Sequence, residues 1–550
     1  MFNGFLATST LAKIRLRFAG SRDVGRSAHR LGVREFSVAT ALSGELRRLM
    51  HWQKILMAWL LFAVVAIVSG AEVVRPLLVE IRHAPEALIA ADGVKAGSGR
   101  FSFDSYDRER VLSVVAGNVL TLASREELAL MQRDGLEVVV VMESPDRLTL
   151  IKRALYGEKL QLDPIYHRYD QIVRRADELA KAHPELITRL QIGETTQFRQ
   201  PIYAFRLSND VTRLQERPAV LFNGCHHSDE VMGAEIVVAL MEKLVAGYGR
   251  DHEVTAWMNS LEIYLVPVIN VDGHNVVTSG HDPRWRKNLR DVNGDGVTGI
   301  YPEGVDVNRG YDFNWAMGGT DDPLKSTYRG AHPFSEAENC AMRHLADMRQ
   351  FLLSVSYHSQ GEVIYYPWSW HGLPAPDDAV IKSIAADVAA RIRTMNGQGT
   401  YAIAPGGPSS QSYPWFYGRR GDFDFIIETG KGAHLFPPAE VPGIIAANLE
   451  GVRALLAHAA GPGLAVQVTD ANSGRPLAAE VWLPAIENEM VDRRHSDARF
   501  GRLWRLLKPG KHQVIVSCPG YRSVVVRDCL VGENSWTPLK VELIRAATTP

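Results

Sequence analysis

The sequence predicts an α/β protein with a central sheet flanked by helices, followed by a small all-β sandwich domain. Up to about residue 460, strand-like apolar runs such as "AVLFNG" alternate with helical patterns, which is typical of α/β domains. After "AAGPGL" the chain changes to short strands separated by Gly, Pro and Asn turns, as in β-sandwiches. A chain of 550 residues is also too long for one ordinary domain.

Residues 50–71 have the features of a secretory signal peptide. Lys54 forms a short basic region, residues 55–68 are apolar, and the small residues "SGA" end at Ala71, after which we expect cleavage. The apolar run is short for a membrane-spanning helix, which needs about 20 residues, so an uncleaved anchor is the less favoured alternative. We therefore expect a secreted or periplasmic protein without stable insertion in a membrane.

Residues 1–49 form a basic preface with nine Lys or Arg and three Asp or Glu. We favour translation from Met50, which leaves this preface untranslated, over an Arg-rich transit peptide, because a transit peptide does not explain the apolar core. Removing residues 1–71, which hold ten basic and three acidic residues, leaves 51 basic and 59 acidic residues and a net charge of −8. A mildly acidic body argues against nucleic-acid binding.

The elements of the remaining chain follow from its apolar patterns. Residues 72–160 predict a small α/β unit, because "VLTLAS", "REELALMQRDG" and "LEVVVVME" have strand, helix and strand patterns in turn. "YDQIVRRADELAKAHPELI" (169–187) predicts an amphipathic helix that ends near Pro184. In residues 161–460, "AVLFNG", "LEIYLVPVIN", "LLSVSYHS" and "FDFIIETG" are strands between helices. In residues 461–550, "AVQVTD", "AEVWLPA", "HQVIVSCPGY" and "SVVVRDC" are the strands of the β-sandwich.

The four cysteines are few and far apart: Cys225, Cys340, Cys518 and Cys529. No C-x-x-C pair is present, which argues against a zinc site made of cysteines. Cys518 and Cys529 either pair as a disulfide in an exported protein or act as two small buried hydrophobic residues.

The stretch "LFNGCHHSDEVMGAE" (221–235) carries a candidate metal site between a strand pattern and a helix pattern. Catalytic zinc sites use three protein ligands, commonly histidine and carboxylate, and keep one position open. His227 and Glu230 are three residues apart, and His226 and Glu230 are four apart, so the spacing leaves the choice of histidine open. By itself H-x-x-E is weak evidence, since most such pairs are surface residues of helices.

Four further segments follow in order: "GHDPRWRKN" (280–288), "GVDVNRGYDFNW" (304–315), "SYHSQGEVIYYPW" (356–368) and "FIIETGKGAHLFP" (425–437). Together with "HSDE" they resemble the zinc carboxypeptidases of the carboxypeptidase A, B and T type, over roughly residues 165–455. The resemblance implies an α/β fold with a central mixed sheet flanked by helices, and one catalytic zinc ion. It implies that His227, Glu230 and His358 are the zinc ligands, because members with doubled histidines use the second. His226 then packs beside the ligands.

The resemblance also implies catalytic and substrate-binding roles. Glu428 matches the glutamate that takes the proton of the attacking water and delivers it to the leaving amine. Arg286 matches the arginine that stabilises the oxyanion. Asn308 and Arg309 match the pair that binds the terminal carboxylate of the substrate, which an arginine meets bidentately. The implied function is a zinc-dependent carboxypeptidase that hydrolyses the C-terminal peptide bond of peptides and proteins.

The segment "YAIAPGGPSSQSYPWFYG" (401–418) departs from the family pattern, since Pro414 stands where the family usually has an aspartate. Tyr401 is the favoured substrate-capping tyrosine, and Tyr413 is the alternative. Tyr413 also falls at the position that sets side-chain preference, where it favours apolar or aromatic C-terminal residues in the substrate.

Two other functions remain as hypotheses. "HSQGE", which begins at His358, resembles bacterial members that cleave γ-D-glutamyl-diaminopimelate bonds in cell-wall peptides. The third hypothesis is an inactive relative that binds through its β-domain. Inactive relatives typically lose a ligand or the general base, whereas this chain retains His227, Glu230, Arg286, His358 and Glu428.

The segment "DVNGDGVTGIYPE" (291–303) begins like a calcium loop, with Asp291, Asn293 and Asp295 as the ligands. Pro302 stands where such a loop usually has a glutamate, so a solvated Gly-rich loop is the slightly favoured alternative.

The flanking segments also resemble parts of known carboxypeptidases. Residues 461–550 resemble the transthyretin-like domain of regulatory carboxypeptidases, and residues 72–160 resemble the pro-segment of digestive and bacterial members. A pro-segment would cover the cleft until it is cleaved.

Overall fold

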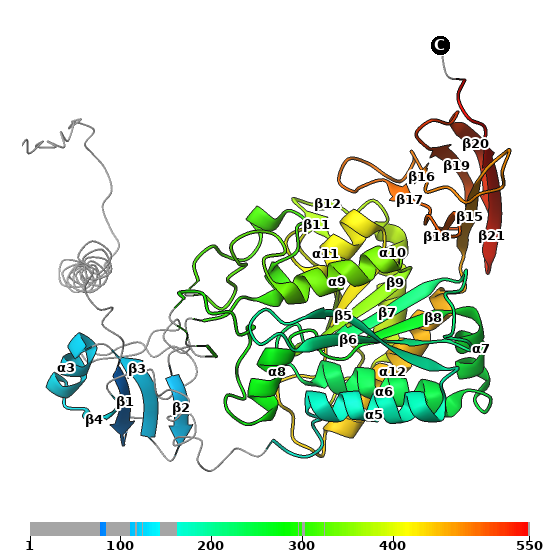
Figure 1. Cartoon of the computed structure of the whole chain (residues 1–550). Coiled ribbons are helices and arrows are strands. Elements are labelled where there is room, and N and C mark those ends of the chain that lie inside the picture. The colour runs from blue at the N-terminus through cyan, green and yellow to red at the C-terminus, as the bar shows by residue number, and fades with distance from the viewer. Residues whose placement is uncertain are drawn as a thin grey trace, which may run out of the picture. The chain divides into compact units, whose positions relative to one another are not determined.

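The computed structural model describes residues 77–83, 111–115, 118–123, 125–142 and 162–547, except residues 295, 297, 300–302 and 324 (Figure 1). The predicted preface (1–49) and signal peptide (50–71) lie outside the described residues. None of the helices in the described part of the chain combines the length and the apolar character needed to cross a bilayer.

The described part of residues 72–160 forms a small sheet with one helix. The strand order is β2 (Val111–Val115), β3 (Asn118–Ala123), β1 (Leu77–Arg82) and β4 (Glu137–Met142), and helix α3 (Arg125–Arg133) joins β3 to β4. Val79, Ile81 and Met131 belong to a core that this sheet forms with its own helix. The order strand, helix, strand agrees with the sequence prediction.

A mixed sheet of eight strands forms the centre of residues 162–460. Its order is β13 (Ala402–Pro405), β10 (Val363–Tyr366), β14 (Phe423–Glu428), β9 (Leu353–His358), β7 (Ala219–Gly224), β8 (Glu262–Val266), β6 (Pro201–Leu207) and β5 (Ile187–Glu194). Strands β14, β9, β7 and β8 are mutually parallel, whereas β6 pairs antiparallel with β8 and β5 pairs antiparallel with β6. Every residue of β7, β8 and β9 is buried, as expected for parallel strands covered on both faces. The predicted mixed sheet is confirmed.

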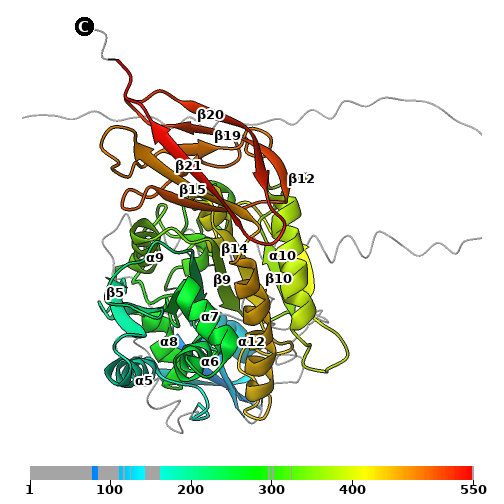
Figure 2. The same ribbon diagram turned by 90° about the vertical axis from the view of Figure 1, so that its right-hand side faces the viewer.

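Helices cover both faces of this sheet: α5 (Tyr169–Ala182), α6 (Met232–Gly247), α7 (His252–Ser260), α8 (Val271–Thr278), α9 (Ala337–Met348), α10 (Asp378–Arg391) and α12 (Val441–His458). Helices α5, α6, α12 and α10 contact one another in that order, whereas α9 packs against β5 (Figures 1 and 2). Short elements complete this region: β11 (Ser369–Trp370), β12 (Leu373–Pro374), α11 (Ser412–Trp415), the 3₁₀ turns η3 (Val307–Arg309) and η4 (Trp315–Met317), and the short π-helix η5 (Phe416–Arg420).

Helix α5 confirms the predicted amphipathic helix. Its buried residues Tyr169, Ile172 and Ala176 lie at helical spacing, which places them on one face against the core. The helix ends at Ala182, and His183 caps it in a non-helical conformation, because the residue before Pro184 is driven away from helical geometry.

Residues 463–543 fold into two sheets around a shared core. One sheet has the order β18 (Arg502–Leu506), β15 (Gly463–Asp470), β21 (Trp536–Leu543), and the other has the order β17 (Arg494–His495), β16 (Glu480–Trp482), β19 (Gly510–Ser517), β20 (Val524–Val531). Val466 and Val541 from the first sheet and Val481 and Val516 from the second belong to one buried cluster. We call residues 463–543 the C-terminal β-segment.

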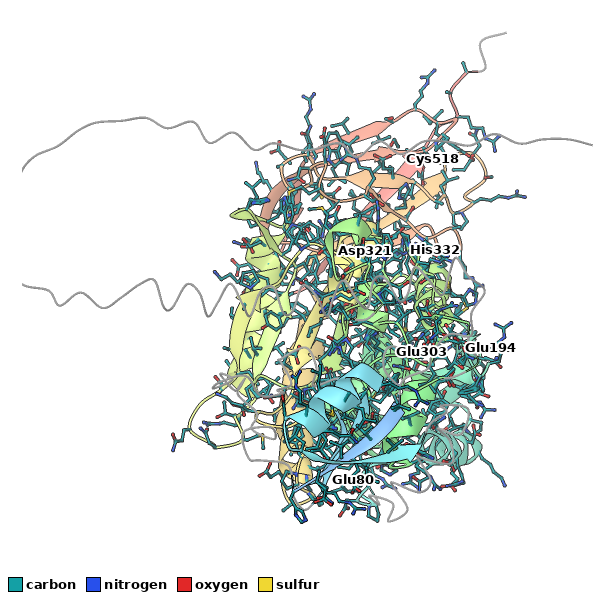
Figure 3. All side chains as sticks on the ribbon, turned by 90° about the vertical axis from the view of Figure 1, so that its left-hand side faces the viewer. Glu80, Glu194, Glu303, Asp321, His332 and Cys518 are labelled. Atoms are coloured by element: carbon teal, nitrogen blue, oxygen red, sulfur yellow. The ribbon has the colours of Figure 1, made fainter. Side chains whose placement is uncertain are left out.

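The four cysteines all lie in the described part of the chain and all are free. Cys518, labelled in Figure 3, and Cys529 are both partly buried in the C-terminal β-segment. Of the two predicted alternatives, the structure therefore has the unpaired thiols.

The first turn of α6 lies so close to the ends of β7 and β9 that only glycine fits there. A Cβ atom on Gly233 would lie 2.9 Å from the backbone oxygen of Tyr357 and 3.1 Å from Cα of Gly224. This close approach brings the start of α6 against the strand ends that carry the candidate site.

We expect Gly233→Ala to lower the free energy of unfolding by about 1–3 kcal/mol, because the backbone of β9 must shift to admit the methyl group. Gly443→Ala in the first turn of α12 is the matched control, since a Cβ there meets nothing within 4 Å. Urea denaturation measures both. Equal stability of the two variants would show that the close approach does not constrain α6.

Candidate active site

The candidate site lies where the parallel strands β7, β9 and β14 end. Gly224 of β7 is in register with Tyr357 of β9, and His358 of β9 is in register with Glu428 of β14. The carboxyl ends of parallel strands meet at one edge of the sheet, which is where open α/β sheets bind ligands. After β7, Cys225 adopts a left-handed conformation with φ of 53°, which turns the chain sharply before His227.

Three buried side chains converge on one point at this edge. His227 Nδ1 lies 2.8 Å from Glu230 Oε1, and His358 Nδ1 lies 2.7 Å from Glu230 Oε2. The two ring nitrogens are themselves 3.1 Å apart. Two imidazole nitrogens and one carboxylate match the ligand set of a catalytic zinc ion. Because their ligand atoms all lie within 4.8 Å of one another, these three residues can hold one metal ion.

Polar contacts around the three residues hold them in place. His227 Nε2 lies 3.1 Å from Asp306 Oδ1, and His358 Nε2 lies 3.2 Å from Asn308 Nδ2. The backbone N–H of Ser359 donates to Glu230 Oε2 at 3.1 Å. Such contacts fix the orientation of metal-binding side chains. Sequence reasoning missed the role of Asp306, although it is the first residue of the "DVNR" motif.

His226 is fully buried with both ring nitrogens engaged elsewhere. Its Nδ1 lies 2.9 Å from Ser356 Oγ and its Nε2 lies 2.8 Å from Tyr311 Oη. Its ring stacks on that of His358, with centroids 5.5 Å apart and planes 11° apart. Burial holds the pKa of His226 well below its ordinary value. The structure therefore brings His227, and not His226, to the convergent set.

A cavity of about 240 Å³ opens beside the convergent set. Seven of the nine site residues expected from the sequence line it: His227, Glu230, Arg286, Asn308, Arg309, His358 and Glu428. Burial, and then the neighbouring Glu230 carboxylate, raise the pKa of Glu428 to about 7. Glu428 is thus a carboxyl group poised near neutrality beside the three candidate ligands.

Arg286 is held between two carboxylates of the site. Its Nη2 and Nε donate to Asp306 Oδ2 at 3.0 and 3.3 Å, and its Nη1 lies 3.4 Å from Glu230 Oε1. Burial disfavours the ionised form of Asp306, but Arg286, Arg309 and His227 outweigh it and hold the pKa of Asp306 well below its ordinary value. The guanidinium of Arg286 is therefore a fixed cation that faces the cavity.

Asn308 and Arg309 lie on the short turn η3, next to the ligands. Asp306 Oδ1 accepts from the backbone N–H of Asn308 at 2.9 Å, which caps the turn. Asn308 Oδ1 accepts from the backbone N–H of Ser412 at 2.9 Å. One wall of the cavity thus depends on a contact between residues that lie about one hundred positions apart in the sequence.

The two predicted substrate-binding tyrosines do not line the cavity. The hydroxyl of Tyr401 accepts from the backbone N–H of Gly430 at 2.9 Å, and that of Tyr413 donates to the backbone oxygen of Gly407 at 2.7 Å. Both side chains are buried, at 5% and 2% exposure. Their hydroxyl groups are engaged by the backbone, so the structure does not bring them together with the other seven residues.

The cavity contains a histidine that sequence reasoning did not single out. His434 Nδ1 lies 2.6 Å from Oδ2 of the buried Asp229, and His434 lines the cavity with Glu428. The hydrogen bond to Asp229 raises the pKa of His434. Two signals were present: Asp229 stands inside "HSDE", and His434 follows Glu428 by six positions in a segment already compared with the family.

In the candidate calcium loop, both carboxylate oxygens of Asp291 accept hydrogen bonds from the backbone of the loop itself. Asp291 Oδ1 accepts from the backbone of Gly294 at 2.7 Å, and Oδ2 accepts from Gly296 at 2.8 Å. Glu303, labelled in Figure 3, accepts from the backbone N–H of Val292. Asp295 lies outside the described residues, as do parts of the loop after it. None of the described acidic residues of this loop belongs to a three-residue metal cluster, so the calcium prediction is not supported.

Comparison with known proteins agrees with this geometry. Residues 172–450 match the family model described as zinc carboxypeptidase, which is half of the chain. Carboxypeptidase A4 of Mus musculus is 28% identical over 306 residues, which cover 53% of this chain and 70% of the relative. Carboxypeptidase A1 of Rattus norvegicus is 28% identical over 285 residues, which cover 50% of this chain and 66% of the relative.

Among solved structures, carboxypeptidase A from Helicoverpa armigera aligns with 71% of this chain and 98% of that chain, at 18% identity and a TM-score of 0.48. The family match covers the candidate ligands, Arg286, the "DVNR" motif and Glu428. The chain therefore belongs to the zinc carboxypeptidase family of metallopeptidases.

Proposed function

We propose that this chain is a zinc-dependent carboxypeptidase that removes residues from the C-termini of peptides and proteins. The observation that carries the proposal is the single cavity that His227, Glu230 and His358 share with Glu428, Arg286 and Arg309. It combines a metal ligand set, a general base and two cations within one cavity. That is the set of groups that hydrolysis of a terminal peptide bond requires.

The residues would divide the chemistry as follows. His227, Glu230 and His358 would hold a zinc ion, which when bound would supply Lewis acidity to the scissile carbonyl and to the attacking water. Glu428, at the end of β14, accepts the proton of the attacking water and returns it to the leaving amine. Arg286, whose position Asp306 fixes, stabilises the negative charge that develops on the carbonyl oxygen.

Arg309 and Asn308 account for the choice of a C-terminal bond. Arg309 lines the cavity and carries a planar guanidinium that can meet a carboxylate bidentately. Asn308, on the same turn, contacts His358, so the proposed carboxylate site adjoins the metal ligands. Substrates without a free terminal carboxylate would lose this anchor.

The flanking segments extend the proposal. We assign residues 50–71 to a signal peptide, which would export the protein. The C-terminal β-segment has two sheets around one core, which supports its assignment as a transthyretin-like domain. The N-terminal sheet has its own core, which supports the assignment of residues 72–160 as a pro-segment. This segment precedes residues 161–460, which we call the catalytic region.

The first prediction concerns the metal. We expect one zinc ion per chain, loss of activity on chelation, and recovery when zinc is returned. Changing His358 to Ala removes one ligand and should reduce bound zinc at least about tenfold. The matched variant His226→Gln, next to a ligand in sequence, should retain one zinc ion. Metal analysis after dialysis measures both, and zinc loss in His226→Gln alone would reverse the assignment of ligands.

The second prediction concerns the general base. Glu428→Gln should keep one zinc ion but release C-terminal residues about 100-fold or more slowly, because the variant cannot accept a proton. The surface variant Glu178→Gln should leave the rate unchanged. The assay is amino-acid release from a panel of peptides. The panel includes γ-D-glutamyl-diaminopimelate peptides. Cleavage of these alone would identify cell-wall peptides as the substrate class.

The same residue sets the expected pH dependence. The base acts when ionised, so kcat/KM falls as pH drops through the pKa of Glu428. Burial and Glu230 raise that pKa from 4.5 to about 7, and a zinc ion beside the carboxylate opposes the rise. The acid limb of the profile should therefore lie between 4.5 and about 7. A limb at the same pH in Glu428→Gln would assign it to another group.

The third prediction concerns the N-terminal sheet. Limited proteolysis between β4 and α5 should raise kcat/KM if residues 72–160 cover the cleft as a pro-segment. The measurement follows activity and fragment size over the digestion. Release of the segment without any gain in activity would show that it does not inhibit the enzyme.

A further inference from the structure

The segment from Gln411 to Arg420 connects the substrate cavity to the C-terminal β-segment. At its first end Gln411 lines the cavity and the backbone N–H of Ser412 donates to Asn308 at 2.9 Å. Its second end is η5, a short π-helix, which is a rare geometry and is often found at functional sites. We call residues 411–420 the connecting segment.

Two arginines of the C-terminal β-segment hold the second end. Arg494 on β17 donates from Nη1 to the backbone oxygen of Gly418 at 3.2 Å, and the backbone N–H of Asp492 donates to the same oxygen at 2.8 Å. Arg505 on β18 donates from Nη2 to both oxygens of Asp377, each at 2.8 Å. Asp377 in turn accepts from the hydroxyl of Tyr417 at 2.8 Å.

These contacts are buried and strong. The side chains of Arg505 and Asp377 are 3% and 1% exposed, and Glu487 Oε1 lies 3.5 Å from the same guanidinium nitrogen. A buried charge that loses its partner is strongly unfavourable, so this pair resists separation. The contacts of Arg494 and Arg505 therefore fix the positions of Tyr417 and Gly418.

The connecting segment has little freedom to move without affecting the substrate-binding turn. A Cβ atom on Gly418 would lie 2.2 Å from the ring of Phe313, so this ring packs directly against the backbone of Gly418. Ser410, just before the segment, donates through its backbone N–H to Phe313 at 2.7 Å and accepts from Tyr311 at 3.1 Å. Because Phe313 follows Arg309 by four residues, a shift of η5 is passed on to the turn that carries Asn308 and Arg309.

We propose that Arg494 and Arg505 are positioning residues for substrate binding, which act through the connecting segment on Asn308 and Arg309. This inference rests on the proposed carboxypeptidase function. Under this proposal the C-terminal β-segment contributes to the affinity of the catalytic region for its substrate. The zinc ligands contact neither arginine, so the effect falls on substrate binding rather than on metal binding.

The test compares two arginines that both link the C-terminal β-segment to the catalytic region. Arg505→Met removes the contact with Asp377 and, through it, the hold on Tyr417. Arg502→Met is the matched control, since Arg502 on β18 pairs with Glu216 at 2.6 Å, away from the connecting segment. Kinetics use the full chain and an N-acyl dipeptide that ends in phenylalanine.

For Arg505→Met we expect KM to rise about tenfold while kcat changes less than about threefold, as for loss of uniform binding. Bound zinc should stay at one ion per chain, and Arg505→Lys should recover part of the affinity. Arg502→Met should retain the KM of the wild type. The double variant Arg505→Met with Asp377→Leu removes both charges of the contact with Asp377, and it should show the same rise in KM.

An unchanged KM in the double variant would overturn the inference, as would an equal rise in KM in Arg502→Met. A parallel loss of kcat and zinc in Arg505→Met would also overturn it, because that pattern indicates a general effect on folding. Failure of the proposed function is distinguishable, since the wild type itself would then release no C-terminal residue.

Discussion

The parallel pairing of β7, β9 and β14 is the constraint on which the rest of the site depends. The register of these strands places His358 beside Glu428 and the end of β7 beside Tyr357. A slip of one residue in β9 would turn His358 to the other face of the sheet. The sharp turn at Cys225 and the close approach of Gly233 then bring His227 and Glu230 over the same edge. Backbone geometry thus determines the ligand set before any metal binds.

The electrostatics of the cavity follow from that geometry. The buried carboxylate of Asp306 pairs with the partly exposed Arg286, and that of Asp229 pairs with the partly exposed His434. The carboxylates of Glu230 and Glu428 line the same cavity, and burial together with repulsion from Glu230 raises the pKa of Glu428. A divalent cation between His227, Glu230 and His358 would relieve this repulsion. Metal binding and the acidity of Glu428 would therefore be coupled through Glu230.

The C-terminal β-segment packs against the catalytic region through apolar contacts and a buried ion pair. Leu506 and Val491 belong to the hydrophobic core of the catalytic region, and Trp504 and Trp536 pack against that core. The buried pair of Arg505 and Asp377 adds a specific polar contact to this apolar surface. Apolar packing alone tolerates small displacements, whereas a buried ion pair requires one geometry. This difference explains how the β-segment can set the position of a loop near the substrate.

The sequence by itself determined the elements and the chemical types of the site. Apolar runs bounded by turns located β7, β8, β9 and β14, and Pro184 marked the end of α5, because these features are local. The ordered motifs also identified seven of the residues that line the cavity. Four of them lie at a strand end or just after one, whereas Arg286, Asn308 and Arg309 lie between α8 and α9.

Only the tertiary structure decided which groups meet. The spacing of "HHSDE" allowed either histidine, and the contacts of His226 with Ser356 and Tyr311 excluded it, although these partners lie far away in sequence. Tyr401 and Tyr413 were expected from the sequence to bind substrate, but their hydroxyl groups form hydrogen bonds with backbone groups. The roles of Asp306, His434 and Arg505 arise from contacts between distant segments. Such contacts depend on strand register and packing, which a local pattern of residues does not contain.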